Sequence, residues 1–337
     1  MSSSDDGSEG NSVDMISSKK EYDEQNNVNN ITEGIDSVVL NDMSTCAACG
    51  KEGNNNDMNT CNKCKSVKYC NAACKKKHRK KHKKECEKRV TELHDEQLFK
   101  EVEPEECPIC FLILPGIKDT TFKSCCGKII CNGCNYSMVM SEGKDLCAFC
   151  RMPPSNTSDE QIKRIKKLME SGNSEAFNQL AGHYAQGTCG LSQNWAKANE
   201  LMLKAGELGC AGAYFNLGCS YRDGDADVEI DMRKARHYFE LAAMEGNVSA
   251  RYNLGFLEYG NLQRAYKHFI LAAKAGDEEC LDAVKQGFMK GIVTKDEYAS
   301  TLRAYYERQQ EMKSDSRDKA EASDMFNRQW YARTEED

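Results

Sequence analysis

The placement of cysteine constrains this chain more than any other feature of its sequence. Of the 19 cysteines, 15 fall between Cys46 and Cys150, mostly as close pairs, and four are scattered later. The chain begins MSSSDDGSEG, without the apolar core of a signal peptide, and no later stretch is suited to spanning a bilayer. We therefore expect a cytoplasmic or nuclear protein that is neither secreted nor embedded in a membrane. In such a reducing compartment, clustered cysteines favour metal sites over disulfides.

The first cluster, residues 46–86, has the spacing of eight metal ligands. Two C-x-x-C pairs come first, and then two pairs whose members lie four residues apart, on one face of a helix. Eight such ligands satisfy two tetrahedral Zn²⁺ ions with no open position, which is typical of structural zinc. By spacing alone, His78 is an alternative to His82. The predicted ligands are Cys46, Cys49, Cys61, Cys64, Cys70, Cys74, His82 and Cys86.

The stretch VKYC places the aromatic Tyr69 directly before Cys70, the first cysteine of the third pair. With this feature, residues 46–86 resemble a MYND finger. In that family the two sites interleave, so the resemblance implies that the first and third pairs share one ion and that the second and fourth pairs share the other. Family members that bind proline-rich peptides usually carry Gln and Trp at two positions occupied here by Lys75 and Arg79. The resemblance therefore does not extend to proline-rich ligands.

A basic tract, residues 75–84, overlaps this cluster and has two interpretations. It is either a nuclear-import or nucleic-acid-binding segment, or a cationic face that screens the metal site. Seven thiolates and two Zn²⁺ ions leave a charge of about −3 in a small volume. Lysines beside such a site need no polyanionic partner, and the net charge of the whole chain is −7. We therefore favour the second interpretation and do not expect nucleic acid as a partner.

A second cluster, within residues 105–152, is expected to hold two more Zn²⁺ ions, four in all. Its spacing resembles a RING finger of the rarer all-cysteine kind, whose cross-braced pattern implies that the first and third pairs share one ion. Cys125 and Cys126 are adjacent, so Gly127 is expected to supply a turn; otherwise Asp119 or Asp145 is an alternative oxygen ligand. The predicted ligands are Cys107, Cys110, Cys125, Cys126, Cys131, Cys134, Cys147 and Cys150.

The RING resemblance also implies a surface for a ubiquitin-conjugating enzyme. That surface usually has an apolar residue in the first C-x-x-C, a proline in the last and a basic residue just after it. Ile109 and Arg151 occupy the first and third of these places, and Ala148 stands where proline is usual. The resemblance predicts no catalytic residue in this chain, because the transfer would proceed by proximity.

Beyond the clusters the sequence repeats with a period near 37 residues. Ala176, Leu180 and Tyr184 recur as Ala213, Leu217 and Tyr221, and a third copy begins at residue 250. Small residues at fixed points of paired helices are typical of a helical solenoid. The pattern over residues 173–276 resembles the Sel-one-like repeat, a relative of the tetratricopeptide repeat. We expect an all-α solenoid over residues 158–312, opened by a capping box at Ser158 and closed by a helix that a Thr294/Glu297 capping box starts.

The remaining segments complete the predicted architecture. Residues 1–42 carry ten Asp or Glu against two Lys, so we expect a disordered acidic leader. A linker helix is expected over 87–104 and a frayed charged tail over 313–337. Four later cysteines are expected to pack in the solenoid core: Cys189, Cys210, Cys219 and Cys280.

The fold class that follows is multidomain: two small zinc-stapled modules and then an α-solenoid of about three helix pairs. Modules of about 40 residues have too little apolar core to fold without metal, so the zinc is structural. We expect an adaptor between proteins, with a client on the concave face of the solenoid and with ubiquitin ligase activity as one outcome. The alternative is a nuclear, transcription-associated regulator that uses the first finger and its basic tract.

Overall fold

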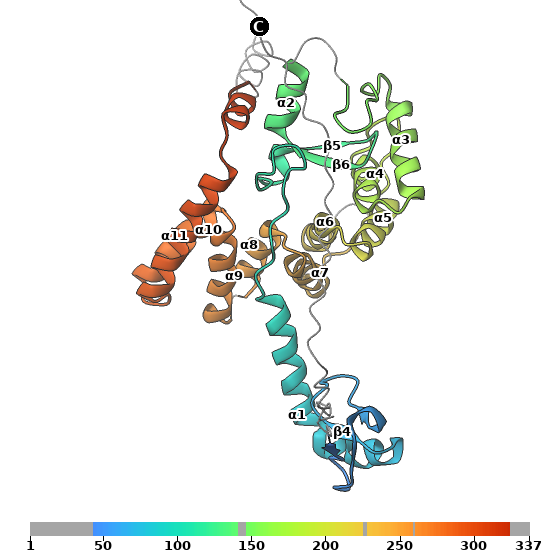
Figure 1. Ribbon diagram of the computed structural model, residues 1–337, viewed down its shortest axis with the longest axis vertical. Coiled ribbons are helices and arrows are strands. Elements are labelled where there is room, and N and C mark those ends of the chain that lie inside the picture. The colour runs from blue at the N-terminus through green and yellow to red at the C-terminus, as the bar shows by residue number, and fades with distance from the viewer. Residues whose placement is uncertain (1–42, 141–145, 225–227, 259, 324–337) are drawn as a thin grey trace, which may run out of the picture.

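The computed structural model describes residues 43–140, 146–224, 228–258 and 260–323 (Figure 1). The expected acidic leader and the end of the charged tail lie outside these residues. Two cysteine-rich modules precede a helical solenoid, as the sequence predicts. Among the described residues, no helix combines the length and the apolar character needed to cross a membrane.

The first module consists of short strands that lie against the start of a long helix. Two antiparallel pairs form, β1 with β2 and β3 with β4, and a 3₁₀ turn at Asn55–Asp57 links them. Asn71 caps the helix by accepting a hydrogen bond from the N–H of Cys74. The elements are β1 (Met43–Thr45), β2 (Glu52–Asn54), β3 (Asn59–Thr60), β4 (Lys68–Tyr69) and α1 (Ala72–Leu98).

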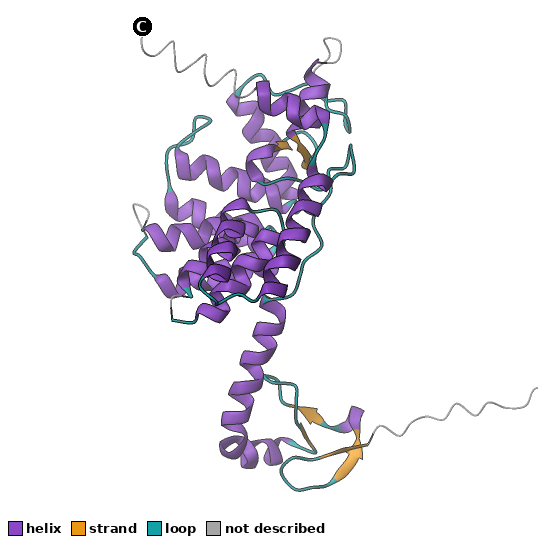
Figure 2. Ribbon diagram, turned by 90° about the vertical axis from the view of Figure 1, so that its left-hand side faces the viewer, coloured by secondary structure: helices purple, strands orange, loops and turns teal. Residues whose placement is uncertain are grey.

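Helix α1 differs from the expected linker helix over 87–104, because it begins inside the first module and ends at Leu98. It is a single 27-residue helix in which only His82, Cys86 and Leu98 are buried. Figure 2 shows it as a stalk, with the first module at one end and the solenoid at the other. One helix thus connects the first metal module to the repeats.

The second module is a hairpin followed by a short helix. Strands β5 and β6 pair from Thr120 opposite Cys131 to Lys123 opposite Lys128. The tight turn between them is closed by two hydrogen bonds to the Lys123 carbonyl, and Gly127 adopts a φ of +72° there. Gly127 thus makes the turn that the sequence predicts. The elements are a 3₁₀ turn (Ile117–Asp119), β5 (Thr120–Lys123), β6 (Lys128–Cys131) and α2 (Asn132–Met140).

The solenoid contains nine helices in the described part of the chain, stacked as antiparallel pairs. Most begin at an Asn, Asp or Thr whose side chain caps the first turn, with Thr157 in place of the expected Ser158 at the first helix. The Thr294/Glu297 capping box is present. The helices are α3 (Ser158–Glu170), α4 (Ser174–Gln186), α5 (Trp195–Glu207), α6 (Ala211–Asp223), α7 (Met232–Met244), α8 (Val248–Leu257), α9 (Leu262–Lys274), α10 (Glu278–Met289) and α11 (Lys295–Met312).

The small repeat residues are explained by the packing between these helices. A Cβ on Gly218 would lie 2.5 Å from the ring of Phe239, and one on Gly255 would lie 2.3 Å from that of Phe269. Buried alanines such as Ala213 and Ala250 let the helix pairs approach in the same way. Small residues such as Gly218 and Gly255 therefore recur 37 residues apart because each lies against an aromatic ring of the following helix.

The solenoid curves around the second module. Figure 1 shows the module between two arms of the arc, with α3 to α5 on one side and α10 and α11 on the other. Phe122 packs against Ile162 and Ile165 of α3, and Asn173 donates a hydrogen bond to the Gly127 carbonyl at 3.4 Å. The concave side that the sequence predicts as a client surface thus holds the second module of the chain itself. The linker after α1 lies against the same solenoid, where Arg251 of α8 donates to the Lys100 carbonyl and Lys274 of α9 pairs with Glu101.

The tail differs in part from the frayed segment expected over 313–337. Residues 315–323 are helical, and Ala320 is only 6% exposed. The guanidinium of Arg317 reaches the second module, where it contacts main-chain oxygens of Leu112 and Ile113. The described part of the tail is therefore packed against the rest of the protein.

Candidate metal centres

The sixteen predicted ligands come together as four separate groups of four. In each group the sulfur or nitrogen atoms all lie within 4.8 Å of one another. The groups are Cys46, Cys49, Cys70 and Cys74; Cys61, Cys64, His82 and Cys86; Cys107, Cys110, Cys131 and Cys134; and Cys125, Cys126, Cys147 and Cys150. These are the interleaved pairings that the two family resemblances imply.

The spacing of the ligand atoms fits zinc and does not fit disulfides. A tetrahedron with Zn–S bonds of about 2.3 Å has edges of about 3.8 Å. The Sγ atoms of Cys61 and Cys86 are 3.8 Å apart, and those of Cys126 and Cys147 are 3.6 Å apart. The Cys64 sulfur lies 3.2 Å from Nε2 of His82. Because a disulfide requires about 2.05 Å between its sulfurs, these atoms are not disulfide-bonded, and their spacing suits ligands of one shared metal ion.

Four of the C-x-x-C turns share one backbone conformation. In each, the N–H of the residue after the second cysteine donates to the carbonyl of the first cysteine, at 2.8 to 3.0 Å. That residue has a positive φ: Gly50 at +74°, Lys65 at +56°, Phe111 at +57° and Arg151 at +58°. A side chain in this region costs free energy, so three of the four turns are held in a strained form. The turn aims both sulfurs at one point.

In each group, at least one thiol is made more acidic by main-chain donors. The N–H of Cys70 has the largest effect on Cys46 and lowers its pKa to about 6. At Cys107 burial opposes ionisation, but the N–H groups of Cys131 and Cys110 outweigh it and lower the pKa to about 6. Cys61 and Cys147 follow the same pattern, with each pKa lowered to about 7 despite burial.

Several other thiols of the groups, Cys74 and Cys86 among them, resist ionisation in the absence of metal. The hydrogen bond with Cys70 raises the pKa of Cys74 to about 12, and burial raises that of Cys86 to about 11. A bound Zn²⁺ takes such thiols as thiolates and displaces their protons. Each group therefore contains at least one acidic thiol that can bind the metal first, and a closed set of four ligands leaves no position for substrate.

Two of the alternative ligands, His78 and Asp119, lie outside the groups. The Nδ1 of His78 is 3.3 Å from the hydroxyl of Tyr69, and its ring stacks on that of His82 with centroids 5.8 Å apart. Asp119 belongs to no group, and Asp145 lies outside the described residues. The tight turn at Gly127 brings both Cys125 and Cys126 into one group.

The four later cysteines lie in the solenoid core or pack against it, as expected. Cys210 and Cys280 are buried, at 8% and 0% exposure, whereas Cys189 and Cys219 are half-buried. Burial raises the pKa of the Cys210 thiol to about 12, which keeps it protonated. Across the described ranges, none of the four belongs to a metal-ligating group.

The tentative contacts for a conjugating enzyme lie in turns of the second module. Ile109 is half-buried and packs in the small core of the module with Cys107 and Ile130. Arg151 is exposed directly after the last cysteine pair. Phe111 and Phe149, in the same turns, are 72% and 39% exposed and were not singled out by the sequence. The two turns thus present apolar side chains beside one cation.

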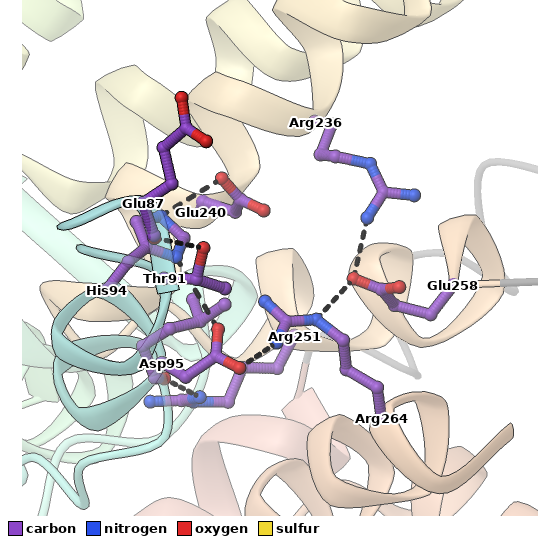
Figure 3. A network of polar contacts seen from close by, with 10 residues as sticks. Glu87, Thr91, His94, Asp95, Arg236, Glu240, Arg251, Glu258 and Arg264 are labelled. Atoms are coloured by element: carbon purple, nitrogen blue, oxygen red, sulfur yellow. Dashed lines mark hydrogen bonds and ion pairs between the residues drawn. The ribbon is translucent and has the colours of Figure 1, made fainter. Parts of the chain in front are cut away.

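A polar network joins α1 to the solenoid, and sequence reasoning missed it (Figure 3). Asp95 of α1 pairs with Arg264 at 2.5 Å, and Arg264 continues to Glu258 at 2.8 Å. Leu98 is fully buried in the core formed by α7 and α8. Arg251, which is 5% exposed, donates to the carbonyls of Leu98 at 2.9 Å, Lys100 at 3.1 Å and Ala243 at 3.0 Å.

A departure from the repeat pattern in the sequence indicates this contact between α1 and the solenoid. The residue after the first conserved alanine is Phe177 in the first copy and Tyr214 in the second, but Arg251 in the third. An arginine in an aromatic core position requires partners, and here they are the main-chain oxygens at the end of α1. The break in the repeat thus marks where the linker binds.

Family models match the first module and the repeats. The MYND finger model matches residues 46–86, and the Sel1 repeat model matches residues 174–210, 211–247 and 248–277. The cysteine groups of residues 107–150 fit a second finger. Sel1 repeats generally mediate protein–protein interaction, which supports a zinc-binding adaptor between proteins.

Among characterised proteins, a 99-residue stretch is 34% identical to the Arabidopsis thaliana protein named ERAD-associated E3 ubiquitin-protein ligase component HRD3B. The match covers 29% of this chain and 15% of that protein, so the chain spans only a small part of its relative.

Two solved structures resemble the solenoid. A Sel1 repeat protein from Oxalobacter formigenes matches with a TM-score of 0.39 and 23% identity, over 44% of this chain and 64% of its own. A protective antigen of uropathogenic Escherichia coli with an SLR fold has a TM-score of 0.38 and 26% identity, over 45% and 33%. The family models thus show a MYND finger and three Sel1 repeats in this chain, and the geometry of residues 107–150 fits a second cysteine finger.

Proposed function

We propose that this chain is an adaptor that brings a ubiquitin-conjugating enzyme, bound on the second finger, close to a client protein bound on the Sel1 repeats. The observation that carries the proposal is the cross-braced pair of four-cysteine groups in residues 107–150. The exposed Arg151 and the apolar side chains of the neighbouring turns supply a docking surface of the RING kind. The similarity to a protein named as a ubiquitin ligase component supports the same role.

In this role the chain positions two proteins and takes no part in bond making. The conjugating enzyme carries ubiquitin as a thioester, and a lysine of the client attacks it. Holding both reactants on one frame raises their effective concentration, which is the source of the rate increase. The second finger suits this because α3 contacts it on one side and the tail on the other. Its distance from the repeats is therefore fixed.

The client must bind where the linker does not lie. Residues 98–102 cover parts of α7, α8 and α9: Arg251 contacts Lys100, Lys274 pairs with Glu101 at 2.9 Å, and Gly246 lies against Val102. We assign the client to the repeat surface outside this strip. Cross-linking of client to purified full-length protein, mapped by mass spectrometry, tests the assignment, and cross-links confined to the linker strip would contradict it.

The decisive experiment is an autoubiquitination assay with zinc-loaded protein and a panel of conjugating enzymes. Ubiquitin chains are expected with at least one enzyme, and they should be lost in the double variant Ile109→Ala, Arg151→Ala. The matched control is Met232→Ala, Arg233→Ala, an exposed apolar and basic pair on α7, and it should keep full activity. Absence of activity with every enzyme would refute the ligase role. The remaining function would then be that of an adaptor without ligase activity.

A second candidate function rests on the exposed cations of α1. Lys76, Lys77 and Arg79 are exposed, as are the four lysines that follow to residue 84. Such a stripe can bind the phosphates of nucleic acid, and the affinity would then fall steeply with salt. Fluorescence anisotropy with duplex DNA across a salt series tests this. A binding constant that does not change with salt would remove the candidate.

A further inference from the structure

The tail of the chain contacts a metal group about 200 residues away in sequence. The Nη1 of Arg317 donates to the carbonyls of Ile113 at 2.8 Å and Met312 at 2.6 Å. Its Nη2 reaches the carbonyl of Leu112 at 3.4 Å and the sulfur of Cys110 at 3.7 Å. One guanidinium therefore joins the end of α11, the backbone after the first C-x-x-C of the second finger, and a ligating sulfur.

The backbone of the tail also lies against the other pair of the same group. A Cβ on Gly133, between Cys131 and Cys134, would lie 2.6 Å from the main-chain nitrogen of Arg317 and 2.9 Å from its Cα. Only glycine permits this approach. The tail thus contacts both halves of the group Cys107, Cys110, Cys131 and Cys134.

The charge of the group explains why a cation is placed there. Four thiolates and one Zn²⁺ carry a net charge of −2, and three of the four cysteines of this group are buried. A guanidinium beside the sulfurs offsets this charge, and its hydrogen bonds to Leu112 and Ile113 fix the backbone that follows the ligand turn. Groups that support metal ligands from outside commonly change metal affinity by about 10- to 100-fold when they are removed.

We propose that Arg317 is a positioning residue for zinc in the group Cys107, Cys110, Cys131 and Cys134. Through it, the carboxyl-terminal end of the solenoid completes the second finger, so metal retention there depends on the tail being docked. The proposal goes beyond the adaptor function and holds whether or not the finger recruits a conjugating enzyme.

The test measures zinc release from the full-length, four-zinc protein to a colorimetric chelator. Arg317→Ala is expected to release one ion at least about tenfold faster, with the other three unchanged. Arg317→Met keeps the length of the side chain without its charge and should behave like Arg317→Ala, whereas Arg317→Lys should fall between it and the parent. Arg303→Ala removes an exposed arginine of α11 and should have no effect.

Two further variants make the test specific to this group. Gly133→Ala should displace the tail and accelerate release of the same single ion. In a Cys107→Ala background, where the group is already broken, Arg317→Ala should add nothing. The proposal is overturned if Arg317→Ala releases all four ions at the parental rate. It is also overturned if Arg317→Ala accelerates all four ions equally, since that would mean general unfolding, or if Arg317→Met retains zinc as the parent does.

Discussion

A single buried histidine gives the solenoid a dependence on pH. His268 is fully buried beside the ring of Phe99, with centroids 4.7 Å apart. Burial, together with the charges of Arg251, Arg264 and Arg236, lowers its pKa to about 3, and the negative charge of Asp95 only partly offsets this. Among the described groups, neither ring nitrogen has a hydrogen-bond partner. The folded state thus holds a neutral imidazole, whereas the unfolded chain takes up a proton below pH 6.5.

The variant His268→Leu is therefore expected to flatten the pH dependence of stability. Since the folded pKa is depressed, the parental protein loses stability as pH falls from 6.5 toward 3. Between pH 7 and pH 5 this loss is about 2 kcal/mol. Denaturant unfolding of both proteins at the two pH values measures it, and zinc loss cancels in the difference. Equal pH slopes for parent and variant would show that His268 takes up its proton in the folded state.

The strained ligand turns give a second prediction for single residues. Gly50→Ala places a side chain at φ +74°, where nothing else lies within 4 Å of the added carbon. The expected cost is about 1 kcal/mol from the backbone alone. Zinc competition titrations should show an approximately fivefold weaker site in the first finger. Lys65→Ala is the control, because that position already holds a side chain at φ +56°. An equal loss in both variants would point to side-chain contacts instead.

The metal ligands were predictable residue by residue, and the supporting residues were not. A C-x-x-C pair is a local pattern whose turn fixes both sulfurs, so spacing indicates most of the ligands, although it left His78 open as an alternative to His82. Arg317 and Arg251 act on backbone more than 150 residues away in sequence, and no local pattern encodes such a contact. Arg251 could be noticed because it replaces the aromatic residue of the other two repeats. Arg317 could not, because it lies in a charged segment that was expected to be frayed.

Among the elements, α1 is the one that connects the first finger rigidly to the solenoid. Pairs such as Lys83 with Glu87 and Lys88 with Glu92 follow its surface at the i, i+4 spacing that stabilises isolated helices. Periodicity around residues 90–98 correctly indicated a helix, but it could not show that this helix continues from the first finger. The ligands His82 and Cys86 already lie on the same helix. The first finger and the linker therefore form one rigid element.

Glu92→Pro is expected to break this rigidity without disturbing either end. Proline removes one helix hydrogen bond and clashes with the carbonyl four residues earlier, at a cost of about 3 kcal/mol. The first finger should then swing relative to the solenoid, and small-angle scattering should show a changed distribution of distances. Glu92→Ala is the control, and zinc content should stay the same in both variants. An unchanged scattering profile for Glu92→Pro would mean that contacts other than α1 hold the first finger in place.

At the scale of the whole molecule, the solenoid packs against two other parts of the chain, the second finger and the linker. The second finger lies between its arms, and the linker passes over α7 to α9 (Figure 1). The number of repeats and their helix pairs followed from the sequence. The packing of the second finger and the linker against the solenoid did not, because repeat patterns describe contacts between neighbouring repeats and say nothing of what a curved stack encloses.

The variant Arg251→Tyr tests this arrangement by returning the third repeat to the aromatic pattern of Tyr214. The repeats should stay folded, because an aromatic residue suits this position of the stack. The linker, however, loses two hydrogen bonds from a buried cation, those to the carbonyls of Leu98 and Lys100, and the carbonyl of Ala243 in α7 loses a third. The docking should weaken by about 3 kcal/mol, since a hydrogen bond to a charged group contributes roughly 1.5–3 kcal/mol and such losses are not additive.

Amide hydrogen exchange of the full-length protein measures the effect. Exchange at residues 98–102 should accelerate by about 100-fold, which is the factor that corresponds to this free energy. Helices α4 to α7 should keep their protection, and Arg233→Tyr, a substitution at an exposed position of α7, should leave the linker protected. Slow exchange at residues 98–102 in Arg251→Tyr would mean that burial of Leu98 alone holds the linker. The hydrogen bonds of Arg251 would then accompany the docking without contributing to its stability.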